Sequence, residues 1–235
     1  MAASTGTPHN RRERPAKPAL TRSGIIATAV ELMRAEGLER VTMRRLAQQL
    51  DTGPASLYVY VRNTAELHAA VLEELLGVVD LAPVRTEGDW TDRLVAVLLS
   101  YTAVLFEHPG LAQSAMVSRP VGPNYLRLLD GLLALLAEGG VPGDRASWAV
   151  DLLLQFGTAT AAEQVTRHRA VDAEEEHHTL TAAVRDISAT RYPHIAARGL
   201  DLLSGPGEAR TEWGFRVLIA GAQDTPRPPH DHQHH

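Results

Sequence analysis

Between residues 42 and 62 the chain gathers hydroxyl, guanidinium and methyl groups within one short stretch. The side chains that carry these groups belong to Ser56, Tyr58, Tyr60, Ala55, Val59 and Arg44. The hydroxyls can donate to phosphate oxygens, which fixes the register of a protein on a duplex. The aliphatic methyl groups can contact thymine, and the guanidinium can donate to both O6 and N7 of guanine. The stretch therefore has the chemistry of DNA recognition.

Motifs of catalytic or cofactor chemistry are absent from the sequence. There is no GxSxG nucleophile motif, HExxH zinc motif, phosphate-binding loop or dinucleotide fingerprint. The chain has no cysteine, which excludes disulfides and thiolate metal sites. The tail histidines His230, His232, His234 and His235 could bind a transition metal, but we expect this tail and the acidic run at 172–178 to be solvated. We expect no enzyme activity, no cofactor and no metal.

Composition and charge indicate a helical cytoplasmic protein with a polyanion-binding end. Ala and Leu dominate the apolar residues and aromatics make up only 5%, which favours helices. No apolar run approaches the roughly 18–20 residues of a membrane span, and no secretory signal precedes the domain. Residues 1–63 hold ten Lys/Arg and five Asp/Glu, whereas residues 64–235 hold thirteen and twenty-three. A basic head on an acidic body is typical of nucleic-acid binding.

Short amphipathic helices would position the side chains of the first stretch. Thr21 and Thr42 can cap two of them, and Pro54 suits the first turn of a third, after the turn DTGP. Residues 57–61, LYVYV, alternate like a strand, but no second alternating run lies nearby, so we predict a helix. Asn63 can cap the next helix. Two helices joined by a tight turn, the second exposing hydroxyls and methyl groups, form a helix-turn-helix.

The fold class predicted from these patterns is all-α. Further helices are expected at 90–106, 110–116, 124–138, 144–168, 181–192 and 208–221, with a loop at 172–178 and a turn near Pro193. The predicted organisation is a disordered basic arm (1–19), a three-helix helix-turn-helix domain (20–79), a helical bundle for ligand binding and dimerisation (80–222), and a disordered His/Pro-rich tail (223–235).

At residues 41–67, VTMRRLAQQLDTGPASLYVYVRNTAEL, the chain resembles the tetracycline-repressor (TetR) family of one-component bacterial regulators. The resemblance is clear over 21–79 and weaker through the body. It implies an all-α homodimer with a DNA-binding head and a ligand-sensing body. With the exposed faces predicted above, it assigns DNA contacts to Thr42, Arg44, Arg45, Pro54, Ala55, Ser56, Tyr58, Val59, Tyr60, Arg62 and Thr64. Two departures are Asp51, where the family usually has Gly, and Thr64, where Lys is common.

For the body, the resemblance implies that segments 144–168 and 207–222 form a four-helix dimer interface. We assign to it Trp148, Leu152, Trp213, Phe215, Leu218 and Ile219, although these residues could instead close the core of one chain. A cavity between bundle helices is the expected ligand site, with Phe106, Met116, Arg119, Phe156, Thr160 and Glu163 as candidate lining residues or, alternatively, ordinary core or loop positions. Ala115 stands where tetracycline repressors carry a metal-liganding His, so a tetracycline–magnesium ligand is not expected, although Glu163 matches an acidic pocket residue.

The predicted function is a ligand-responsive transcriptional regulator, a repressor in the commonest family mode. It would bind a palindromic double-stranded DNA operator as a homodimer and be released by an unknown small-molecule effector, without a membrane partner. One alternative is a helical dimer whose head binds a protein, which the basic exposed face disfavours. A second is an all-α enzyme that uses the body cavity, for which the sequence supplies no nucleophile–base pair.

Overall fold

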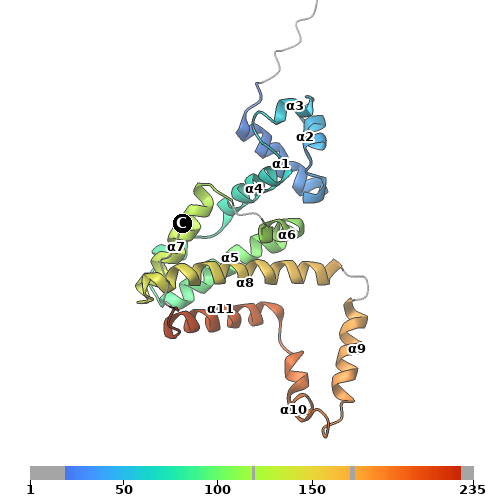
Figure 1. Ribbon diagram of the computed structural model, residues 1–235, viewed down its shortest axis with the longest axis vertical. Coiled ribbons are helices and arrows are strands. Elements are labelled where there is room, and N and C mark those ends of the chain that lie inside the picture. Colours follow the sequence, from blue (N-terminus) through green and yellow to red (C-terminus); the bar gives the residue numbers. More distant parts are fainter. Residues whose placement is uncertain (1–18, 118–119, 170–172, 229–235) are drawn as a thin grey trace, which may run out of the picture.

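The computed structural model describes residues 19–117, 120–169 and 173–228, and within these ranges the chain is helical without strands. Residues 19–79 form a head, and the described residues from 80 onward form a body (Figure 1). The head contains α1 (Arg22–Glu36), α2 (Met43–Gln49), α3 (Pro54–Leu57) and α4 (Thr64–Leu75), with short 3₁₀ turns η1 (Leu38–Arg40) and η2 (Leu76–Val78). The all-α fold predicted from the sequence is confirmed.

Three predicted helix caps hold the head helices at their N-termini. The Thr21 hydroxyl accepts from the Gly24 N–H at 3.1 Å, and the Thr42 hydroxyl accepts from the Arg45 N–H at 3.2 Å. The Asn63 side chain accepts from the Glu66 N–H at 2.8 Å. Each cap satisfies an N–H group that has no partner within its own helix.

The LYVYV segment begins as a helix and ends as a helical turn. Helix α3 stops at Leu57, but the Val61 N–H still donates to the Leu57 carbonyl at 3.0 Å. Leu57 and Val61 are both buried, as the predicted helical spacing requires. The segment is therefore not a strand, and its regular helix is shorter than predicted.

The body is a bundle around one long helix. It contains the 3₁₀ turn η3 (Ala82–Arg85) and α5 (Trp90–Glu107), α6 (Pro109–Val117), α7 (Pro123–Glu138), α8 (Gly143–Arg169), α9 (Ala173–Arg185), α10 (Pro193–Leu202) and α11 (Gly207–Asp224). Helices α5, α6, α7 and α11 all pack on α8, while α9 and α10 pack chiefly on each other. In Figure 1 this α9–α10 hairpin extends away from the bundle, and α2 and α3 lie at the end of the head farthest from the body.

The predictions for the last third of the chain need correction. Helix α9 includes the described part of the acidic run that was predicted as a loop, and it ends at Arg185 rather than at residue 192. The predicted turn near Pro193 is helix α10. The two helices are paired because Val184 packs where Gly199 has no side chain; a Cβ at Gly199 would lie 2.3 Å from it.

The predicted tail is also partly structured. Helix α11 continues to Asp224, and the Arg227 guanidinium lies 4.1 Å from the centre of the Trp148 ring. The last helix therefore extends two residues beyond the predicted boundary at 222, whereas 229–235 and the predicted arm at 1–18 lie outside the described residues.

Of the helices that the structure describes, none alone is long and apolar enough to cross a membrane; only the bent pair Trp90–Glu107 and Gly110–Met116 has that length and composition.

Candidate nucleic-acid interface and ligand cavity

The exposed surface of the head is made by α2, α3 and the turn that follows α3. Predicted contact residues that are solvent-exposed there are Thr42, Arg44, Pro54, Ala55, Ser56, Tyr58, Val59 and Arg62. The Val59 side chain is 80% exposed and Tyr58 is 52% exposed, which is unusual for residues of this size. Behind this surface, Leu46 and Leu57 are fully buried. Helix α2 and α3 thus present small, aromatic and cationic groups outward from a rigid core.

Two predicted contact residues have hydrogen-bond partners inside the head, and a third is partly buried there. The Tyr60 hydroxyl donates to the Leu20 carbonyl at 2.8 Å, so its proton is not directed at solvent; its predicted role as a phosphate donor is corrected. Thr64 is partly buried in the first turn of α4. The Arg62 Nε donates to the Glu66 carboxylate at 2.9 Å, while most of its side chain remains exposed.

Arg45 is turned toward helix α1 rather than outward. Its Nε donates to Glu36 Oε2 at 3.2 Å, a second guanidinium nitrogen bonds the other Glu36 oxygen, and Nη1 donates to Gln49 at 3.3 Å. The hydrogen bonds from Arg45 hold the pKa of Glu36 below its ordinary value. The prediction that Arg45 contacts DNA directly is therefore not supported by its position, which ties α2 to α1.

Asp51 lies in the turn between α2 and α3 with φ +49°. Among the described residues it is the only non-glycine with a positive φ. This is the position at which a glycine was expected, and the left-handed conformation explains why: glycine adopts it without a Cβ penalty. A residue with a Cβ has a steric cost in this conformation, and Asp is one of the few side chains that tolerate it.

A cavity of about 320 Å³ lies between α4 and the helices of the body. It is lined by Leu72, Leu76, Tyr101, Ala115, Met116, Pro120, Tyr125, Asp151, Leu154, Gln155, Thr158 and Ala159. The Tyr101 hydroxyl and the Thr158 hydroxyl are 2.7 Å apart, and Thr158 donates to the Leu154 carbonyl. Because that donation uses the Thr158 proton, Tyr101 donates to Thr158. The cavity wall combines aliphatic and aromatic side chains with hydroxyl, amide and carboxylate groups.

The predicted lining residues are mostly elsewhere. Only Met116 lines this cavity, and Arg119 lies outside the described residues. Phe156 packs edge-on against Phe215 at 5.0 Å, and Glu163 is exposed in an ion pair with Arg167 at 2.6 Å. Phe106 and Thr160 are partly buried but do not line it. The sequence-based choice missed Tyr101, Tyr125 and Thr158, whose signal was a hydroxyl on an otherwise aliphatic helix face.

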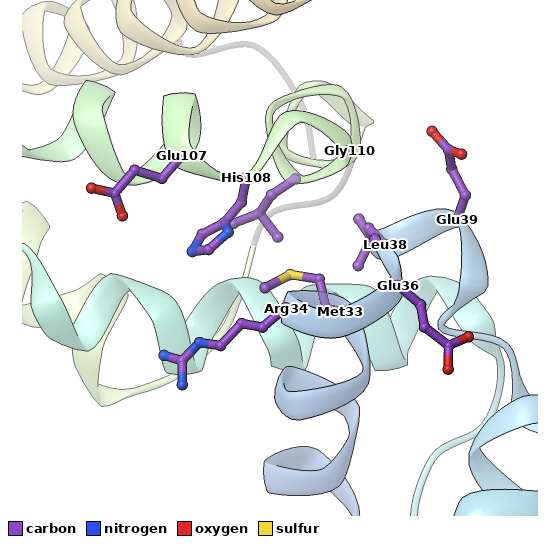
Figure 2. A pocket seen from close by; sticks show the side chains of 10 residues that line it. Met33, Arg34, Glu36, Leu38, Glu39, Glu107, His108 and Gly110 are labelled. Atoms are coloured by element: carbon purple, nitrogen blue, oxygen red, sulfur yellow. The ribbon is translucent and has the colours of Figure 1, made fainter.

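A second cavity, of about 310 Å³, lies where the head meets the body. Its walls are the end of α1, η1 and the corner between α5 and α6. Figure 2 shows the His108 ring pointing from that corner toward Met33 and Arg34. Burial lowers the pKa of His108, and the nearby Arg34 cation lowers it further, while Glu107 opposes both. The sequence analysis did not single out this histidine.

The residues assigned to a dimer interface fall into two groups. Trp148, Leu152 and Trp213 are exposed, with Trp213 at 68%. Phe215 and Ile219 are 0% and 1% exposed, so they face the core of their own chain, and their assignment to an interface is wrong. Leu218 is partly buried against the same core. The reason is the helical period: residues 215 and 219 share the face of α11 that packs on α8, opposite Trp213.

Known proteins share this architecture over nearly the whole chain. Residues 25–71 match the family described as "Bacterial regulatory proteins, tetR family", and residues 82–225 match "Tetracyclin repressor-like, C-terminal domain". The crystal structure of SCO7704 from Streptomyces is 56% identical, with 91% of this chain and 99% of that chain covered and a TM-score of 0.75.

Two further relatives carry a named partner or activity. The structure of the TetR family protein ActR of Streptomyces coelicolor in complex with actinorhodin is 33% identical, with 87% and 96% of the two chains covered and a TM-score of 0.78. The transcriptional repressor DrrR1 of Streptomyces coeruleorubidus is 28% identical, covering 91% of this chain and 81% of that protein. With both domains matched in order and the helix-turn-helix surface in place, the chain belongs to the tetR family of bacterial regulatory proteins.

Proposed function

We propose that this protein is a transcriptional repressor that binds a palindromic operator as a homodimer and leaves it when a small molecule occupies the body cavity. The observation that carries the proposal is the exposed α2–α3 surface, where Arg44, Ser56 and Val59 point away from a buried core. A surface of this kind suits the major groove, which an α-helix can enter. Its charge and hydroxyl content favour DNA over a protein partner.

Within the proposed complex, base and phosphate contacts come from different residues. Arg44 would donate to guanine, and Ala55 and Val59 would contact thymine methyl groups. The Tyr58 hydroxyl and the exposed Arg62 guanidinium would bind phosphates and so fix the register. Two heads would read successive major grooves about 34–36 Å apart, which requires two chains.

The dimer would form through the exposed apolar face of α8 and α11. Trp148, Leu152, Trp213 and Val217 are all exposed there in the single chain. Exposed apolar residues that gather on one face mark an interaction surface, and an isologous pairing buries the same face twice. The α9–α10 hairpin adds exposed apolar side chains at Leu180, Leu200 and Leu202. Such a hairpin, extended from its own bundle, fits a second copy of the chain.

The effector would occupy the cavity beneath α4. Leu72 in α4 and Leu76 in η2 belong to the head, whereas Tyr101 and Thr158 belong to the body. An occupant of the cavity would therefore contact both parts. An effector that binds one head–body arrangement more tightly shifts the population toward it. The aromatic and hydroxyl lining suits a mostly apolar molecule with hydrogen-bonding groups, and the complex of ActR with actinorhodin is a related case.

The test is fluorescence anisotropy with the DNA that flanks the protein's own gene, measured across a salt series. Wild type is expected to bind one site selectively, with log affinity falling linearly against log salt. Arg44→Ala should weaken binding by about 5- to 150-fold, the equivalent of about 1–3 kcal/mol for one base contact. Arg34→Ala is the matched control, because Arg34 is exposed near the end of α1 at the head–body cavity and not on the α2–α3 surface.

The outcomes separate the rival functions. Equal losses in both variants, or binding that is weak and blind to sequence, would contradict base reading by the α2–α3 surface. Affinity without salt dependence for a protein partner would favour a protein-binding head. Chemical turnover of a compound bound in the body cavity would favour an enzyme.

A further inference from the structure

A carboxylate on helix α4 crosses the boundary between head and body and contacts the start of helix α7. Glu73 Oε1 accepts from the Asn124 N–H at 2.6 Å, and Oε2 accepts from the Tyr125 N–H at 3.2 Å. The Asn124 side-chain amide donates back to the Glu73 carbonyl at 2.9 Å. Three hydrogen bonds therefore join one residue of the head helix to two residues of the body.

Local sequence does not cap helix α7, and Glu73 takes that place. The residue before the helix is Gly122, which has no side chain to accept from the first N–H groups. A carboxylate at that position satisfies two such groups and interacts favourably with the positive end of the helix dipole. Glu73 is only partly exposed there, which limits screening by solvent.

Gly122 also makes the approach of Glu73 possible. A Cβ on residue 122 would lie 2.3 Å from Glu73 Cδ, well inside contact distance. The backbone of Gly122 is extended, with φ −157°, so an alanine is acceptable to the backbone itself. The small residue is therefore required by the carboxylate that packs on it and not by the turn.

We propose that Glu73 is a positioning residue that fixes the angle of the head relative to the body, and thereby the operator spacing that the protein accepts. The apolar side chains Leu72 and Leu76 that pack beside Glu73 impose no particular direction on the joint, whereas its three hydrogen bonds define one geometry. Leu72 and Leu76 flank Glu73 and line the body cavity, so this joint adjoins the proposed effector site. The effect on operator spacing rests on the proposed DNA binding, whereas the effect on the head–body angle does not.

The first test measures the joint without DNA. The absence of native cysteine allows two labels to be placed by Ala27→Cys on α1 and Ala134→Cys on α7, both exposed. The distance between the two labels is then measured by double electron–electron resonance. The labelled chain is mixed with an excess of unlabelled chain, so that each dimer contains at most one labelled chain. Glu73→Gln should broaden or shift the head-to-body distance distribution, and the Asn124 and Tyr125 amides should exchange at least about tenfold faster. Glu74→Gln, an exposed neighbour, is the matched control and should leave both unchanged.

The second variant perturbs the same contact from the body side. Gly122→Ala displaces the Glu73 carboxylate and should give the same broadened distribution. In a Glu73→Ala background, Gly122→Ala should add nothing, because the two changes remove one contact. Additive effects of the two changes would show that Gly122 acts through another contact and would overturn this part of the proposal.

The third readout is operator spacing. On operators whose half-sites are moved apart or together by one base pair, wild type should discriminate at least about tenfold, and Glu73→Gln should lose most of that discrimination. A distance distribution that is unchanged in Glu73→Gln, with only a lower melting temperature, would reduce Glu73 to a helix cap and overturn the proposal. If the protein binds no DNA, the proposed function fails while the distance measurement still decides the role of Glu73.

Discussion

The head and the body differ in how much of their apolar surface a single chain can bury. In the head, the exposed large apolar side chains among the described residues are Tyr58 and Val59, at the proposed DNA surface, and Val78, in the turn η2 next to the body. In the body, exposed apolar side chains occur along α8, α9, α10 and α11, with Trp213 and Leu202 each more than 60% exposed. A single chain therefore buries most of the apolar surface of the head, whereas it leaves a large apolar surface of the body exposed to solvent.

The head and the α9–α10 hairpin are stabilised by different kinds of contact. Head helices are fixed by caps and by a buried aliphatic core within 60 residues of sequence. The α9–α10 hairpin, by contrast, has few contacts with its own bundle and high apolar exposure, as expected if the proposed second copy covers it. Four predictions test this contrast, beginning with the largest expected effect.

Trp213→Asp should dissociate the dimer. The side chain would be buried in the proposed interface, and an isologous interface contains it twice, so the loss is about 4–6 kcal/mol of dimerisation free energy. Sedimentation velocity across a concentration series measures the change. The control is Leu126→Asp on α7, also an exposed apolar residue but not part of the proposed α8–α11 interface. A dimer that survives Trp213→Asp, or that is equally lost in Leu126→Asp, would place the interface elsewhere.

The same contrast explains which features could be predicted from the sequence. Thr21, Thr42 and Asn63 act on N–H groups three residues away, so their caps follow from local sequence alone. The bond from Tyr60 to the Leu20 carbonyl spans 40 residues and depends on how the third helical segment packs on the first. Spacing placed Tyr60 on the outer face of the segment but could not reveal this partner.

In the body, helical periodicity identified apolar faces but not what each face contacts. Phe215 and Trp213 are two residues apart on α11, and only packing on α8 decides that Phe215 is buried and Trp213 exposed. The hairpin was missed for a related reason: a polar, acidic helix whose apolar side chains are exposed resembles a loop by composition. The cavity wall is assembled from α4, α5, α6, α7 and α8, and no single segment indicates it.

Tyr58→Phe and Tyr60→Phe should affect different properties of the head, operator binding and stability respectively. Tyr60→Phe removes the hydrogen bond to Leu20 and should lower the free energy of unfolding by about 0.5–1.5 kcal/mol. Tyr58 is exposed, so Tyr58→Phe should leave stability unchanged and weaken operator binding by about fivefold, the value of one hydrogen bond. Urea unfolding and anisotropy measure the two quantities. Interchanged results would mean that the exposed surface of the head has been assigned to the wrong tyrosine.

His108 should make the head–body junction sensitive to acid. Because burial lowers its pKa, the assembled junction binds fewer protons than the separated one. Its contribution is therefore complete above the ordinary histidine pKa of 6.5 and is lost as pH falls from there toward the lowered pKa. Protonation would add a cation beside Arg34, but the attraction of Glu107 is larger than that repulsion, so burial is what makes the protonated ring unfavourable.

Urea midpoints measured between pH 8 and about pH 5 test this dependence, within the range where histidines titrate. His108→Gln should flatten the part of the decline that lies near and below pH 6.5. His194→Gln, on the exposed surface of α10, is the control and should follow wild type. Parallel profiles for wild type and His108→Gln would show that other groups cause the acid sensitivity.

The smallest expected effect concerns Asp51, whose left-handed backbone conformation is unfavourable for a residue with a Cβ. Glycine would relieve the positive φ but would also gain more freedom in the unfolded chain, so the two effects partly cancel. Asp51→Gly should raise the free energy of unfolding by only about 0.5 kcal/mol, whereas Asp51→Ala should lower it by about 1 kcal/mol, because alanine keeps the Cβ and lacks the polar group that helps Asp adopt this conformation. Urea unfolding of the three proteins checks the order Gly, Asp, Ala. If alanine were as stable as aspartate, the turn between α2 and α3 would have to relax out of the left-handed region, and Arg44 and Ser56 would no longer share one rigid surface.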